Sequence, residues 1–146
     1  MPATGPEVSR RVWLFASLAA CLRADSEDDV WEVLGRMASS LSAGNVPAFL
    51  DPIDRSMSGL EDLRVNLNAL LGQAEVQSSL ELISNEGDDS ARTVEADWLL
   101  RITRRDEISG ARKRQQNVKC GFRKMGKKWK VVSLEPRSFF GAAEPK

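Results

Sequence analysis

Apolar residues in the first half of the chain recur at every third or fourth position, which is the spacing of one helix face. This pattern predicts a first helix over residues 26–41, which begins at a weak capping box of Ser26 and Asp29 and ends before Gly44. The apolar face of this helix consists of Val30, Val33, Leu34, Met37, Ala38 and Leu41. Such a face has to be buried, so the helix is expected to lie on the core.

Two further helices are predicted before the pattern changes. Residues 45–50 form a very short helix, because Asn45 is a good N-cap residue and a proline follows in the first turn, where its missing N–H is harmless. A third helix begins at a capping box of Ser58 and Glu61 and ends at Gly72. Its apolar face consists of Leu60, Leu63, Leu67, Leu70 and Leu71.

From residue 74 onward apolar residues alternate with polar ones, which is the period of a β-strand. Strands are predicted over 74–83, 94–103, 112–124 and 128–134. The clearest apolar strand face consists of Val94, Ala96, Trp98, Leu100 and Ile102. Three helices followed by a four-stranded antiparallel meander form an α+β fold with segregated elements.

The composition narrows the chemistry that this domain can perform. The 146 residues include no His and no Tyr, so the chain has no imidazole base, no histidine-ligated metal site and no phenolic proton donor. We expect neither a cofactor nor a metal. Cys120 lies in a predicted strand and is expected to be a small core residue rather than a nucleophile.

The net charge of zero conceals a division between the two halves of the chain. Residues 21–90 carry 14 acidic and 4 basic side chains, whereas residues 91–146 carry 6 acidic and 15 basic side chains. A basic surface can bind phosphates, but these bases are not interleaved with exposed aromatic residues, and lysines also protect the edges of sheets. We therefore expect one domain with two differently charged faces and no nucleic-acid partner.

Residues 1–24 have the organisation of an export signal. Arg10 and Arg11 precede an uncharged apolar run over 12–20, which is about half the length needed to cross a bilayer. The residues that end in Cys21 resemble a bacterial lipobox, which predicts lipidation at Cys21 and an exported protein that is periplasmic or anchored to the membrane only by its lipid. Ser9, Arg10 and Arg11 also resemble a twin-arginine signal. The alternative is an uncleaved amphipathic helix in a cytoplasmic protein.

Two local sequences carry a resemblance to a known family. They are Ser42-Ala43-Gly44-Asn45-Val46-Pro47-Ala48-Phe49-Leu50 and Gly126-Lys127-Lys128-Trp129-Lys130-Val131-Val132-Ser133-Leu134-Glu135-Pro136. With this order of elements, the chain resembles the nuclear transport factor 2-like superfamily and its SnoaL-like members, which share a cystatin-like fold. The resemblance implies a cone-shaped domain in which a strongly curved sheet wraps the helices, a pocket inside the cone and a homodimer formed through the sheet.

This chain lacks most of the catalytic side chains that enzymes of this superfamily carry in their pockets. In catalytic members such as ketosteroid isomerases and scytalone dehydratases the pocket carries an acid, a Tyr or a His, and neither Tyr nor His occurs in this chain. Limonene epoxide hydrolase-like members use paired Asp residues with an Arg. Asp97 with Arg101 or Arg114 imitates that set only loosely, because Asp97 lies on the polar face of its strand.

Three residues are the candidates for a ligand site inside the cone, namely Trp98, Arg114 and Gln116. Arg114 and Gln116 share a strand face whose later members are apolar, and an inward arginine suits a carboxylate or phosphate. The alternatives are that Arg114 is hydrated at the rim of the sheet and that Trp98 is a core residue. The predicted partner is a small anionic or apolar ligand.

The sequence thus predicts a signal segment at 1–24, a domain at 25–140 and a disordered tail at 141–146. The expected function is an exported or membrane-tethered, non-catalytic pocket domain that binds a small ligand or a partner protein. The alternative is a His-free isomerase or hydrolase that uses a carboxylate base in the cone cavity.

Overall fold

The computed structural model describes residues 25–106 and 110–142. The predicted signal segment with its lipidation site Cys21, and residues 143–146 of the predicted tail, lie outside this part of the chain. Within the described residues no helix has the length and apolar character needed to span a membrane.

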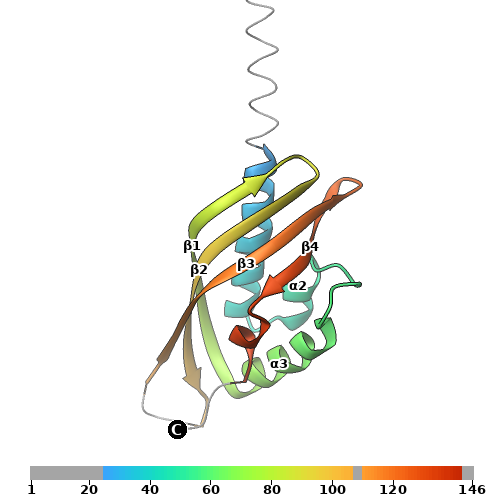
Figure 1. Ribbon diagram of the computed structural model, residues 1–146. Helices are drawn as coiled ribbons and strands as arrows, with labels where there is room; N and C mark the ends of the chain where they lie inside the picture. The colour runs from blue at the N-terminus through green and yellow to red at the C-terminus, as the bar shows by residue number, and fades with distance from the viewer. Residues whose placement is uncertain (1–24, 107–109, 143–146) are drawn as a thin grey trace, which may run out of the picture.

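The helical half has the three predicted helices (Figure 1). The first occupies residues 25–42 and is called the N-terminal helix below; α2 (Val46–Leu50) and α3 (Leu60–Gln73) follow it. The predicted cap of the short helix is confirmed, because the side-chain oxygen of Asn45 accepts a hydrogen bond from the amide of Ala48 at 3.1 Å. The predicted apolar faces of both long helices are buried, except that Leu60 at the start of α3 retains intermediate exposure.

Both predicted capping boxes are wrong. Ser26 is already helical and buried, and its hydroxyl donates to the carboxylate of Asp89 at 2.7 Å instead of capping its own helix. The N-cap of α3 is Gly59 rather than Ser58, with no side-chain cap. Gly59 has a φ of 79°, a left-handed conformation that favours glycine, and a Cβ there would also displace the side chain of Arg137.

The sheet is the predicted antiparallel meander, with β1 (Ala74–Gly87), β2 (Ala91–Arg104), β3 (Arg112–Met125) and β4 (Lys128–Glu135) in the order β1-β2-β3-β4. It is open, because β1 and β4 are the two ends of this order. The register shifts between Leu82 and Ser84 in β1 and again at Gly121, and such bulges bend a sheet. The helices cover the face that carries Trp98, which is called the inner face below (Figure 1).

A short 3₁₀ helix, η1 (Arg137–Phe140), follows the last strand and was not predicted. Four residues are too few to show a helical period, so the pattern gives no sign of it. Its Phe139 and Phe140 are buried in the same cluster as the helices and the inner sheet face. The end of the domain is therefore part of its core.

Candidate functional site: a surface groove beside α2, α3 and β4

The structure places Trp98 in the core, which was the alternative to a role in ligand binding. Its side chain is fully buried, and its indole N–H donates to the hydroxyl of Ser78 at 2.6 Å. The ring centroids of Phe140, Phe49 and Phe139 lie 4.9, 6.3 and 6.4 Å from that of Trp98. These distances are those of paired aromatic rings, so the chain's own side chains surround this indole.

Arg114 binds the backbone of η1 and of the two residues after it. One terminal nitrogen of its guanidinium donates to the carbonyls of Phe139 at 2.8 Å and Gly141 at 2.9 Å, and the other donates to the carbonyl of Ala142 at 3.1 Å. These charge-assisted bonds use the donors that a carboxylate ligand would need. Gly141 and Ala142, the first residues of the predicted tail, are held in this way.

Gln116 lies opposite Trp98 in the β2–β3 ladder, and Arg114 lies opposite Leu100. The three predicted residues therefore share the inner face, as the alternation indicated. They differ in what they can offer a ligand, because Gln116 is exposed, Trp98 is buried and Arg114 is bonded to backbone carbonyls.

The strand acids lie on the opposite, outer face of the sheet. Glu81 is paired with Asp97 and Glu95 with Lys119 in the ladders. The carboxylate of Asp97 accepts a hydrogen bond from the amide of Gln115 at 2.6 Å. A carboxylate in this position does not enter the space enclosed by the helices.

Cys120 is fully buried, and burial raises the pKa of its thiol, because an apolar environment disfavours the thiolate. The expectation of an unreactive core cysteine is consistent with this position. Among the described residues no three His, Cys, Asp or Glu side chains lie close enough together to hold a metal ion.

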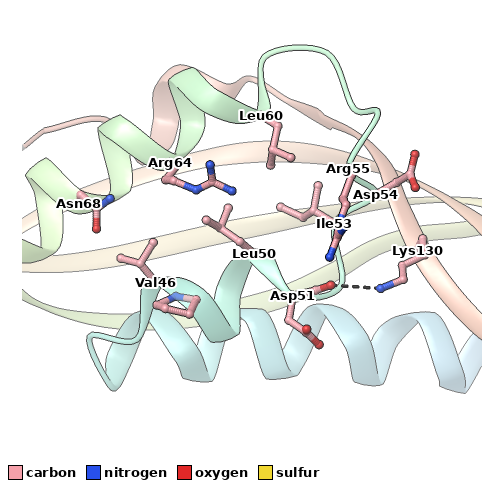
Figure 2. A pocket seen from close by; sticks show the side chains of 11 residues that line it. Val46, Leu50, Asp51, Ile53, Asp54, Arg55, Leu60, Arg64, Asn68 and Lys130 are labelled. Atoms are coloured by element: carbon pink, nitrogen blue, oxygen red, sulfur yellow. Dashed lines mark hydrogen bonds between the residues drawn. The ribbon is translucent and has the colours of Figure 1, made fainter.

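A groove opens on the surface where α2, the segment after it, α3 and β4 meet (Figure 2). Its volume is about 600 Å³. The segment after α2 is fixed to β4, because the amide of Asp54 donates to the carbonyl of Val131 at 2.8 Å and the amide of Val131 donates to the carbonyl of Pro52 at 2.9 Å. These bonds fix the position of the segment after α2. The groove lies between this segment and the first turns of α3.

Four aliphatic side chains form what we call the apolar floor of the groove, namely Val46, Leu50, Ile53 and Leu60. Val46 and Ile53 are buried, whereas Leu50 and Leu60 retain intermediate exposure. The floor thus presents partly exposed apolar surface in a concave place, which is the usual character of a ligand site.

Charged side chains surround this floor. Arg64 is paired with Glu61 at 2.5 Å, with 46% and 74% of the two side chains exposed. Lys130 donates to the backbone carbonyl of Asp51 at 3.2 Å, and Arg55 also lines the groove. Figure 2 shows the guanidinium of Arg64 directed over Leu50.

A second hollow, of about 490 Å³, lies on the other side of Asp51 and Lys130, which line both. Its walls carry opposite charges, with Glu32 on the N-terminal helix and Lys128 on the β3–β4 hairpin. Trp129 also lines it, and within the described part of the chain its indole N–H is buried without a hydrogen-bond partner.

One feature of the sequence relates to the groove. Arg55 and Arg64 are two of only four bases in the acidic stretch 21–90, and both line it. The sequence does not show that Arg55 and Arg64 line one groove, because the position of the segment that carries Arg55 depends on the pairing of Ile53 with Val131.

Solved structures with the same arrangement identify the fold. No protein-family model and no curated protein matches the sequence. A nuclear transport factor 2-like protein with a cystatin-like fold from Novosphingobium aromaticivorans superposes with a TM-score of 0.64 at 12% identity, covering 83% of this chain and 84% of that one.

A nuclear transport factor 2-like superfamily protein from Salmonella enterica gives a TM-score of 0.62 at 13% identity, over 84% of this chain and 95% of that one. A cystatin-like protein of unknown function from Nostoc punctiforme gives 0.54 at 20% identity, over 73% and 85% of the two chains. The chain therefore has the nuclear transport factor 2-like, cystatin-like α+β fold, in which the helices lie within a cone-shaped, open four-stranded sheet.

Proposed function

We propose that this chain is a non-catalytic binding domain that holds a small ligand in the groove between α2, α3 and β4. The observation that carries the proposal is the apolar floor, which remains partly exposed beside three cationic side chains. The residues first expected to bind a ligand offer less, since Trp98 is enclosed by aromatic rings and Arg114 is bonded to three carbonyls.

The positions of the strand acids favour binding over catalysis. A carboxylate base with a raised pKa needs an apolar surrounding. Glu81, Glu95 and Asp97 lie on the outer face instead, and the chain has no His or Tyr to act in their place.

Export and assembly belong to the same proposal. The arginines, apolar run and Cys21 of residues 1–24 support an exported protein, either periplasmic or held by a lipid at Cys21. The outer face supports a homodimer through the sheet, because it carries acids on β1 and β2 and the bases Lys119 and Arg123 on β3, so that a two-fold axis would bring unlike charges together.

The test is native mass spectrometry of the full chain purified from the cells that produce it. The wild type should retain a small molecule, and Leu60→Trp, which fills the groove, should not. Val65→Trp is the matched control, because Val65 lies on the same helix with 59% of its surface exposed and does not line the groove.

Loss of the molecule in both variants or in neither would contradict this location. Turnover of an epoxide, ester or ketosteroid substrate that disappears in Asp97→Asn would contradict the non-catalytic assignment.

A further inference from the structure

We infer that the ligand of this groove is a single-chain anionic amphiphile, a carboxylate with an aliphatic chain. This inference rests on the proposed function and specifies its ligand. The aliphatic chain would lie on the apolar floor, and the carboxylate would bind the guanidinium of Arg64.

The floor accounts for the aliphatic part of the ligand. All four of its side chains are aliphatic, with no aromatic ring on which a base or a sugar could stack. Covering Leu50 and Leu60 removes apolar surface from water, which favours binding in proportion to the area covered.

Arg64 accounts for the anionic part. Its present partner, Glu61, is largely exposed, and ion pairs between exposed side chains contribute little because water competes for both charges. A ligand carboxylate beside the floor would be less hydrated than Glu61, and it can accept two parallel hydrogen bonds from one guanidinium. Breaking the exposed pair with Glu61 therefore costs little, and a ligand carboxylate can compete for Arg64.

The acids that line the groove do not oppose this arrangement. The carboxylate of Asp54 accepts hydrogen bonds from the amide of Ser56, at 3.3 Å, and from its hydroxyl. Figure 2 shows the carboxylates of Asp51 and Asp54 directed away from Leu50 and Leu60, whereas the guanidinium of Arg64 lies beside Leu50. The charge that faces the floor is thus positive.

The experiment compares decanoate with decan-1-ol, which has the same chain without the charge, by calorimetric titration of the full-length protein below the micellar concentration. Decanoate should bind about tenfold more tightly than decanol, because one charge-assisted hydrogen-bonding group is gained. Arg64→Gln should lower the affinity for decanoate by about the same factor and leave that for decanol unchanged. Arg64→Lys keeps the charge but not the two parallel donors of the guanidinium. Its affinity for decanoate should lie between those of the wild type and Arg64→Gln.

Arg123→Gln is the control, because Arg123 is an exposed arginine on the outer face of β3. Equal binding of decanoate and decanol, or an equal loss in Arg64→Gln and Arg123→Gln, would overturn the inference and leave the proposed function standing. If neither compound binds and the native protein carries no ligand, both are overturned. Arg64-dependent sedimentation with phosphatidylglycerol vesicles, without decanoate binding, would assign the charge to a lipid surface and also overturn it.

Discussion

The interior around Trp98 and the groove beside α3 are built from similar parts, and one is closed while the other is open. Each combines apolar side chains with an arginine. In the interior, Phe139 and Phe140 cover the indole and Arg114 binds the carbonyls that follow them. In the groove, Leu50 and Leu60 stay partly exposed and Arg64 is paired with an exposed glutamate. The comparison shows that η1 covers the interior, whereas no segment among the described residues covers the groove in the same way.

The largest effect on stability is expected from removing a ring of η1 that covers Trp98. Phe140→Ala should lower the free energy of unfolding by about 3–5 kcal/mol, because a buried ring is lost and a cavity is left beside Trp98 and Phe49. Urea denaturation measures this change. Ser138→Ala, an exposed position in the same turn, should change it by less than about 0.5 kcal/mol. Equal stability of Phe140→Ala and the wild type would mean that η1 does not complete the core.

The two arginines should differ in the next experiment. Arg114→Met should destabilise the fold by about 1.5–3 kcal/mol, since its hydrogen bonds to the carbonyls of η1 and the residues after it are lost. Arg64→Gln should cost less than about 1 kcal/mol, because its ion pair is exposed. Thermal unfolding of both variants in one buffer measures the two losses of stability. A larger loss of stability in Arg64→Gln than in Arg114→Met would contradict the roles assigned to the two regions.

A smaller effect is expected from the polar contact within the interior. Ser78→Ala leaves the indole N–H of Trp98 buried without its acceptor, which should cost about 1–2 kcal/mol. Ser79→Ala, on the exposed side of the same strand, is the matched control. If the two variants unfold at the same urea concentration, the hydroxyl of Ser78 contributes nothing to closing the interior.

The β1–β2 turn belongs to neither region and should give the smallest effect. Hydrogen bonds from the amides of Ser90 and Ala91, and from the hydroxyl of Ser90, lower the pKa of Asp88 below its ordinary value of 3.8. A lowered native pKa adds stability above the ordinary value, and that stability is lost as the pH falls through the native one. The fall in the urea midpoint from pH 7 to pH 3 should therefore be smaller in Asp88→Asn than in the wild type. A control, Asp28→Asn, removes an exposed helical carboxylate instead, and an equal change in both variants would contradict the role of the turn.

Local patterns were sufficient for most of the fold. The cap at Asn45 and the four strands depend on neighbouring residues and on side-chain alternation, and the structure confirms them. The predicted start of α3 was wrong because its N-cap is Gly59, whose φ of 79° favours glycine and which lies beside the side chain of Arg137, far along the chain. The sequence shows that Trp98 and Arg114 lie on one face, but it does not show that the residues after β4 return to cover that face.

The groove was not predicted for a related reason. Its parts lie within or beside helices whose apolar positions all look alike in a periodic pattern, so Leu50 and Leu60 could not be told apart from buried leucines. Their partial exposure depends on where the segment after α2 is fixed, which the bridge between Ile53 and Val131 determines.

The place of η1 along the chain also sets the order in which the core forms during synthesis. Domains begin to fold while the ribosome is still adding residues. Phe139 and Phe140 emerge after every other core residue, so Trp98 and Phe49 remain without their cover until almost the whole domain has been made. A chain truncated just before η1 would keep every residue of its helices and its sheet but would leave these rings without their cover.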